Sequence, residues 1–413
     1  MSVISVFSGT FCKGDRILQD LIRESGYALV RDPDIIAQAG TLSGIDQDKI
    51  ERAFSTKVSA FNRFTHEKER SIAYLKLALA QTLREDKLII EGFCGQLIPR
   101  DITHVLRVCL ISDMAHRLTL ATQDHAIDQN EAIRLIRKHD EDRASWVESI
   151  SGKKDPWDAS LYDILIPTDK TPMNEISKMI LQYLGKNVVE YTNQSRQTVQ
   201  DFLLAADVEV ALAKEGHNVD VHAEEGLVTL TINKHVLMLN RLEDELKSIA
   251  GKVPEVKTVR TKVGPGFHQT DIYRRFDFDM PSKVLLVDDE REFVQTLSER
   301  LLMRDMGSAV AYDGESALEM IKEDEPEVMI LDLRMPGIDG IEVLRRVKET
   351  QPDIEVIILT GHGSEADRAT CMKLGAFAYL QKPVDIDELS QTIRKANEKI
   401  QHKKTGQTVV VEK

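Results

Sequence analysis

The stretch KVLLVDDE, residues 283–290, decides the fold of the last third of this chain. Its apolar run ends at two aspartates, which is typical of a buried strand in a parallel sheet with polar residues at its carboxyl end. Working outward, similar runs occur at 328–331 (VMIL), 356–359 (VIIL) and 376–380 (AFAYL), separated by helix-sized intervals. These four runs belong to residues 283–401, a segment in which we expect five strands that alternate with helices.

Polar residues follow these predicted strands where each one ends, and they are Asp288, Asp289, Asp332, Thr360 and Lys382. In an open parallel sheet such positions share one edge, where ligands bind. Three carboxylates placed together repel one another unless a cation lies between them, and hard oxygen ligands suit Mg²⁺. Asp332 is then placed to attack a phosphoryl group, while the Lys382 ammonium and the Thr360 hydroxyl stabilise the transferred oxygens.

This segment resembles the receiver domain of bacterial two-component response regulators. The resemblance implies a (βα)5 flavodoxin-like fold, a phosphoryl group on Asp332, and a sensor histidine kinase as its source. It also implies a switch pair, Thr360 and Tyr379, and a cis peptide at Lys382-Pro383. The metal ligands that it implies are Asp288, Asp289, Asp332 and the backbone carbonyl of Arg334.

The chain begins with a second informative stretch, VISVFSGTFCKGDRIL at residues 3–18. Gly9 and Gly14 have the G-x-x-x-x-G spacing of a phosphate-binding loop, but Asp15 and Arg16 stand where Lys and Ser or Thr should follow. Short apolar strands alternate with amphipathic helices over residues 1–200, which predicts a parallel α/β domain.

Residues 3–185 resemble the cytidylate-kinase-like family of P-loop proteins. The resemblance implies ATP and CMP as ligands, although Asp15 competes with a bound phosphate. Either Lys13 and Arg16 replace the missing residues in a weak kinase, or the fold persists without catalysis as a sensor or docking surface. We favour the second interpretation. The nucleotide-contacting residues implied are Gly9, Lys13, Gly14, Arg16, Arg107, Arg117 and Arg143.

Residues 201–263 predict a small α+β domain of order αββαβ. This order resembles the BON domain, although Ile232 and Glu255 stand where that family has glycine. The family is associated with protein contacts or membrane surfaces, and we favour protein contacts because no lipid-seeking face is evident. Residues 264–282 are expected to be a linker, and residues 402–413 a polar tail.

Composition limits the class of protein. The 413 residues carry a net charge of −14, which argues against nucleic acid as a partner. The four cysteines lack C-x-x-C spacing, and neither a signal peptide nor a membrane-spanning run is evident, so we expect a cytoplasmic protein.

The sequence therefore predicts a cytosolic response regulator of a phosphorelay, phosphorylated on Asp332 with Mg²⁺. The receiver would control the partner contacts of a degenerate nucleotide-kinase-like domain and a BON-like domain, by surface docking or by formation of a homodimer. The alternative is a nucleoside monophosphate kinase of the cytidylate type that is gated by phosphorylation. A scaffold protein is a third interpretation.

Overall fold

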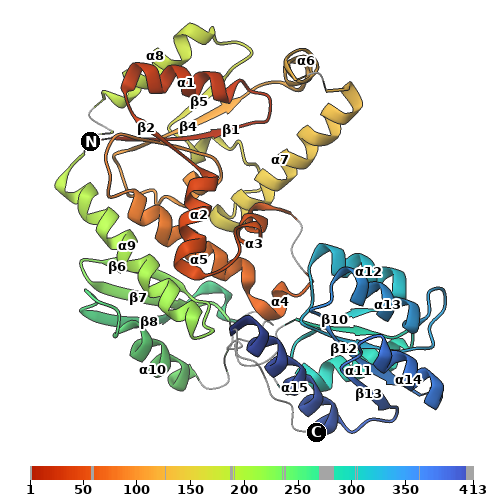
Figure 1. The fold of residues 1–413 in the computed structure, drawn as a ribbon. Helices are drawn as coiled ribbons and strands as arrows, with labels where there is room; N and C mark the ends of the chain where they lie inside the picture. The colour runs from red at the N-terminus through yellow and green to blue at the C-terminus, as the bar shows by residue number, and fades with distance from the viewer. Residues whose placement is uncertain are drawn as a thin grey trace. The chain divides into compact units, whose positions relative to one another are not determined.

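A computed structural model shows the fold of the chain (Figure 1). Contacts divide the chain into two compact units, Met1–Val58 with Lys68–Arg274, and Ser59–Glu67 with Arg275–Lys413. The residues that the structure describes are 2–56, 60–125, 127–186, 189, 191–234, 236, 239–268, 283–302, 304, 306–361 and 363–405.

A parallel sheet with strand order β2-β3-β1-β4-β5 forms the centre of the N-terminal domain. β1 lies between β3 and β4, so the loop after it leaves the sheet where the strand order reverses. That point is where open α/β sheets bind ligands. The strands are β1 (Val3–Ser8), β2 (Ala28–Arg31), β3 (Leu88–Glu91), β4 (Val105–Ile111) and β5 (Ile164–Pro167).

Helices cover both faces of this sheet, which explains why β1 is buried from Val3 to Phe7. α1 and α8 pack on one face, while α2, α5 and Trp146 of α7 pack on the other. The longer helices are α1 (Gly14–Ser25), α2 (Asp32–Ser43), α5 (Glu67–Thr82), α6 (Met114–Asp124), α7 (Gln129–Ser151) and α8 (Met173–Leu184). The shorter ones are α3 (Gln47–Glu51), η1 (Arg52–Phe54), η2 (Cys94–Leu97) and η3 (Ala159–Leu161).

The middle domain has the predicted αββαβ order. Its elements are α9 (Asn193–Lys214), β6 (Asp220–Glu224), β7 (Leu227–Ile232), α10 (Leu239–Ala250) and β8 (Thr258–Val263). β7 pairs antiparallel with β6 and parallel with β8. Every second side chain of β7 is buried, in a cluster that includes residues of α9 and α10.

α9 joins this small domain to the N-terminal one. Phe202 and Val210 belong to the apolar core of the N-terminal domain, while Val208 and Leu212 belong to the core of the small domain. An ion pair of 2.8 Å between Lys76 and Glu209 adds to the first contact. The helix begins at Asn193, before the boundary expected at residue 201, so the packing is continuous across that boundary.

The receiver has a second parallel sheet, of order β10-β9-β11-β12-β13, as expected. Its strands are β9 (Val284–Val287), β10 (Ser308–Ala311), β11 (Val328–Leu331), β12 (Glu355–Thr360) and β13 (Ala378–Gln381). Its helices are α11 (Arg291–Leu302), α12 (Gly314–Glu323), α13 (Gly340–Thr350), α14 (Glu365–Lys373) and α15 (Ile386–Thr405). Apolar clusters on the two faces of the sheet make the core.

Two predicted connecting segments are described only in part. A short helix, η5 (Pro265–His268), stands at the start of the expected linker, and residues 269–282 lie outside the described residues. α15 continues to Thr405, beyond the boundary expected at residue 401, and residues 406–413 are also outside the described residues.

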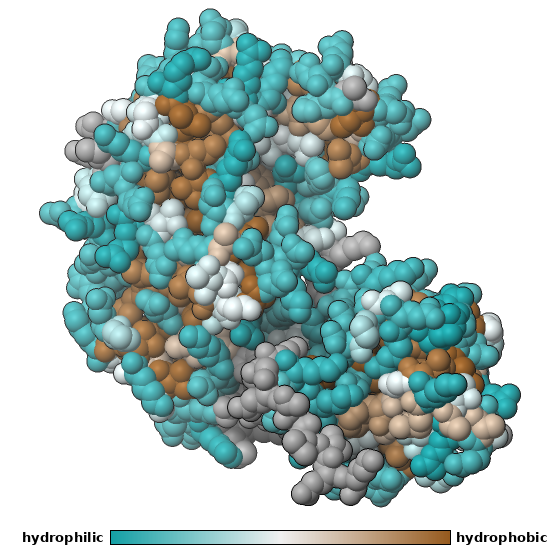
Figure 2. Space-filling view, viewed as in Figure 1, coloured by the Kyte–Doolittle hydropathy of each residue, from teal (hydrophilic) through white to brown (hydrophobic). Residues whose placement is uncertain are grey.

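Hydrophilic residues make up most of the face seen in Figure 2, in both units. None of the helices in the described part of the chain is both long enough and apolar enough to cross a membrane.

Candidate functional site

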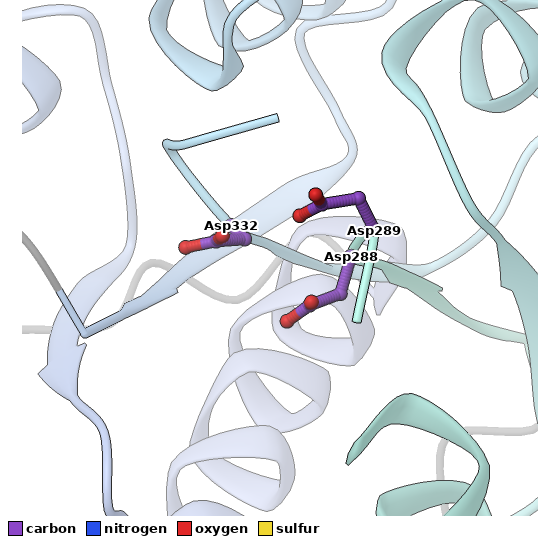
Figure 3. Close-up of side chains that lie close together, drawn as sticks. All are labelled: Asp288, Asp289 and Asp332. Atoms are coloured by element: carbon purple, nitrogen blue, oxygen red, sulfur yellow. The ribbon is translucent and has the colours of Figure 1, made fainter. Parts of the chain in front are cut away.

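Three aspartates gather at the carboxyl edge of the receiver sheet (Figure 3). β9 and β11 are neighbours in register, Val287 beside Leu331, so the residues that follow these strands emerge together. One carboxylate oxygen from each of Asp288, Asp289 and Asp332 lies within 4.8 Å of the other two. Asp288 and Asp332 are only 4% and 5% exposed, whereas Asp289 is exposed.

Lys382 reaches this cluster from the end of β13. Its Nζ lies 2.6 Å from Oδ2 of Asp288 and 3.9 Å from Oδ2 of Asp332. Glu290, which sequence reasoning missed, is a further partner at 3.1 Å. Burial disfavours the Lys382 ammonium, but the hydrogen bond and charge of Asp288, with the other carboxylates, outweigh it and raise its pKa. The amine is therefore held in its cationic form.

One cation does not balance this set of carboxylates. Burial raises the pKa of Asp288, and the hydrogen bonds from Lys382 and from the Glu290 amide offset that rise only in part. Oδ1 of Asp332 is buried and has no hydrogen-bond partner among the described residues. A buried carboxylate oxygen without a partner is costly. This oxygen-only donor set, with an unpaired oxygen, fits Mg²⁺.

The switch pair expected from the sequence lies on the two strands that follow β11 in the order of the receiver sheet. β12 and β13 are neighbours, and they carry Thr360, fully buried, and Tyr379, half-buried. A Cβ placed on Gly363 would overlap the Tyr379 hydroxyl and would lie 3.0 Å from the Thr360 methyl group. The structure thus brings both side chains to Gly363, which has room only for a hydrogen.

The Tyr379 hydroxyl has no hydrogen-bond partner among the residues that the structure describes. Burial, with the nearby Cys371 and Asp367, raises its pKa, so the phenol stays protonated and able to donate. The Lys382-Pro383 peptide is cis, as expected. The Arg334 side chain is exposed, and the role of its backbone carbonyl as a metal ligand remains a prediction.

The loop between β1 and α1 contains Gly9 and Lys13 at the strand-order reversal, and Gly14 is the first residue of α1. Phe11 and Lys13 have φ angles of 60° and 59°, a left-handed conformation that favours glycine. Asp15, at the start of α1, forms an exposed ion pair of 2.7 Å with Arg31. Arg16 is an exposed residue of the same helix.

Two predicted phosphate-binding arginines do reach this loop, but both have partners within the protein. Arg117 donates from Nε to the carbonyl of Thr10 at 2.8 Å, and its other nitrogens donate to Asp140 at 2.7 and 2.8 Å. Arg143 donates to the carbonyl of Ser8 at 3.0 Å. The guanidinium groups therefore stabilise the loop's own backbone.

Arg107 lies elsewhere. It pairs with Ser5 in the middle of the sheet, and its guanidinium donates to the carbonyls of Pro99 and Val105 at 2.6 and 3.2 Å. The contact with a nucleotide phosphate that we expected for Arg107 is thus not supported by its hydrogen bonds, because β4 places it before the strand's carboxyl end.

Aromatic side chains fill the region around Phe93. The Phe93 ring stacks on the Phe54 ring with their centroids 5.1 Å apart, and Trp146 donates from Nε1 to the Phe93 carbonyl at 2.9 Å. The carboxylate of Asp32 accepts the backbone N–H groups of Phe93 and Cys94 at 2.7 and 2.8 Å. The sequence alone did not identify Asp32, Phe54 and Trp146 as the residues that contact Phe93.

Comparison with known proteins agrees with the two larger resemblances. Residues 284–394 match the model of the response regulator receiver domain, and residues 3–170 match that of the cytidylate kinase-like family. The chain therefore carries a receiver domain at its C-terminal end and a domain similar to cytidylate kinases at its N-terminal end. The similarity of residues 201–263 to BON domains stays a prediction.

The receiver also matches individual proteins. It is 42% identical over 113 residues to the transcriptional regulatory protein CpxR of Escherichia coli (strain K12), covering 27% of this chain and 48% of CpxR. It is 36% identical over 115 residues to the response regulator MprA of Mycolicibacterium vanbaalenii, covering 28% of this chain and 50% of MprA. The chain thus spans about half the length of these curated relatives.

A solved structure is also similar, that of a response regulator receiver domain protein from Clostridium thermocellum. It is 36% identical, with 30% of this chain and 97% of that chain covered and a TM-score of 0.28.

Proposed function

We propose that this chain is a response regulator that receives a phosphoryl group on Asp332 from a sensor histidine kinase. The observation that carries the proposal is the buried Oδ1 of Asp332, without a hydrogen-bond partner among the described residues, beside two further aspartates and Lys382. Oxygen nucleophiles of this kind form covalent phosphoryl intermediates.

In the proposed transfer, an oxygen of the Asp332 carboxylate forms a bond to phosphorus. The phosphorus–nitrogen bond of the donor phosphohistidine breaks, and the imidazole nitrogen keeps the electron pair. The Lys382 ammonium neutralises charge on a phosphoryl oxygen, and the Thr360 hydroxyl donates to another. Asp288, Asp289, Asp332 and the Arg334 carbonyl would hold Mg²⁺, which supplies charge neutralisation when bound.

The N-terminal and middle domains supply partner contacts in this proposal, within a cytoplasmic protein. Arg117 and Arg143 donate hydrogen bonds to the carbonyls of Thr10 and Ser8. These bonds support a role without catalysis, because guanidinium groups that are already paired are not free to neutralise the phosphate charge of a nucleotide. For the BON-like domain we propose protein contact as its role.

The test is labelling of the full chain by acetyl phosphate with Mg²⁺, read by intact mass. We expect one phosphoryl group per chain in the wild type and none in Asp332→Asn. Asp353→Asn, at an exposed aspartate after α13, is the matched control and should be labelled normally. Equal labelling of Asp332→Asn would show that the phosphoacceptor is another residue.

A further inference from the structure

A short segment of the N-terminal third of the sequence groups with the receiver. Ser59–Glu67 belongs to the same compact unit as Arg275–Lys413, although the residues on either side of it belong to the other unit. Its described part contains one helical turn, α4 (Asn62–Thr65). In the sequence it lies within the crossover that connects β2 to β3 of the kinase-like domain.

Phe61 anchors this segment. Its side chain is 1% exposed and belongs to the apolar cluster that covers one face of the receiver sheet. The cluster includes Leu285 of β9, Ala309 of β10 and Ile321 of α12. Burial of this phenylalanine removes apolar surface from water and therefore favours the docked position.

An ion pair provides a second contact. Lys283, directly before β9 and only 7% exposed, places Nζ 2.6 Å from Oε2 of Glu67. The same ammonium donates to both carboxylate oxygens of Asp324 at 2.9 and 3.1 Å. Burial disfavours the charged lysine, but the charges of Glu67 and Asp324 outweigh it and raise the pKa of Lys283. Glu67 thus helps to stabilise a charge that the fold has buried.

The receiver sheet is complete without this segment, since five strands and five helices come from residues 284–405. The family match likewise spans only residues 284–394. A four-residue helix is not stable by itself, so α4 depends on its neighbours, which are the apolar cluster that buries Phe61 and α5, the helix that begins at Glu67. Residues 60–67 therefore have the character of a bound peptide on the receiver.

We infer that residues 60–67 are an intramolecular docking segment, bound by the receiver through Phe61 and Glu67, and that phosphorylation of Asp332 changes how tightly they are bound. The second half of the inference rests on the proposed function. The apolar cluster that holds Phe61 also contains Leu331 and Leu333, the two residues that flank Asp332. Packed side chains of this kind can carry a change at Asp332 to the docked segment.

The test of docking is hydrogen exchange of the full, unmodified chain. The amides of Thr65 and His66 donate to the carbonyls of Phe61 and Asn62 at 3.0 Å, so they report whether the turn is formed. We expect Phe61→Ala and Glu67→Gln each to raise exchange of these amides at least tenfold. Glu325→Gln, at an exposed glutamate close in sequence to Asp324, is the control and should leave exchange unchanged.

Retained protection of β11 and β12 in the variants shows that the receiver is still folded. The inference would be overturned if the amides of Thr65 and His66 were already unprotected in the wild type. It would also be overturned if neither variant changed their exchange rates.

The dependence on phosphorylation is tested with beryllofluoride and Mg²⁺, which mimic the phosphoryl group. We expect a change of at least threefold in exchange of Thr65 and His66 in the wild type and none in Asp332→Asn. Unchanged exchange in a chain that acetyl phosphate does label would overturn the inference and leave the proposed function intact. If acetyl phosphate does not label the chain, the proposed function is refuted. Hydrogen exchange of the unmodified chain then still shows whether the segment is docked.

Discussion

His104 is a buried titratable residue of the N-terminal domain, away from the phosphoacceptor. It is 1% exposed, and its ring nitrogen Nδ1 contacts the hydroxyl of Ser195 on α9. The rings of His104 and Tyr191 pack in a T-shaped arrangement with their centroids 4.9 Å apart. Burial, together with the positive N-terminus and Arg107, lowers its pKa to about 4, although the charge of Asp86 acts in the opposite direction. The imidazole is therefore neutral in the folded protein at neutral pH.

This predicts a loss of stability in mild acid. Between pH 6.5 and about 4 the unfolded chain binds a proton at His104 that the folded chain does not, so the free energy of unfolding falls as the pH falls. The loss is complete below about pH 4 and is at most about 3 kcal/mol. Denaturant unfolding at pH 7 and pH 4.5 should show a smaller pH effect in His104→Gln than in the wild type.

His222→Gln, at an exposed histidine, should behave as the wild type does. An equal pH effect in His104→Gln would mean that other groups carry the acid sensitivity.

At the scale of elements, α7 fixes the loop between β1 and α1. Asp140, Arg143 and Trp146 follow one another at intervals of three residues, so they lie on the same side of this helix. Asp140 accepts a hydrogen bond from Arg117, Arg143 donates to the carbonyl of Ser8, and Trp146 donates to the carbonyl of Phe93. α7 thus pairs with Arg117 through Asp140 and contributes Arg143, so both arginines at the loop already have hydrogen-bond partners.

We therefore expect the full chain to consume no ATP in the presence of CMP, dCMP or UMP. The arginines at the loop would have to give up bonds to Thr10, Ser8 and Asp140 before they could bind a phosphoryl group. A coupled assay of ADP release tests this, with an active cytidylate kinase as the positive control. Turnover that disappears in Arg117→Ala would establish the kinase interpretation.

Some elements of the site could be predicted from the sequence, and the reason is geometric. Asp288, Asp332, Thr360 and Lys382 each follow an apolar run, and a parallel sheet brings the carboxyl ends of its strands together. The partners of Arg117 could not be predicted, because one is the backbone carbonyl of Thr10 and the other, Asp140, lies on a helix distant in the sequence. Phe61 could not be placed either, since nothing in the sequence distinguishes it from the nearby Phe54 and Phe64 as the residue that contacts a distant domain.

At the scale of the whole molecule, the two compact units have separate apolar cores. The kinase-like and middle domains share α9, while the receiver has its own clusters on both faces of its sheet. Multidomain proteins depart from a single two-state transition, so we expect these two units to unfold in separate transitions. The unit that binds a ligand is also the one that the ligand stabilises.

Calorimetry of the full chain should therefore show two transitions, of which Mg²⁺ with beryllofluoride raises only one. At a ligand concentration of about 100 times Kd the stabilisation is about 2.7 kcal/mol. Asp289→Ala, which removes an exposed carboxylate of the cluster, should reduce the shift without altering the other transition. A shift of both transitions by the same amount would show that the two units unfold together.

The two apolar sides of α9 also bear on how such a chain can be rearranged during evolution. Recombination at residue 200, where the sequence changes character, would separate Val199 from Phe202 and Val210 and leave a helix with half of its apolar surface uncovered. The kinase-like and middle domains are therefore expected to be inherited as a single block that ends after β8. A new receiver could join that block after residue 263, but it would also have to recognise the sequence around Phe61.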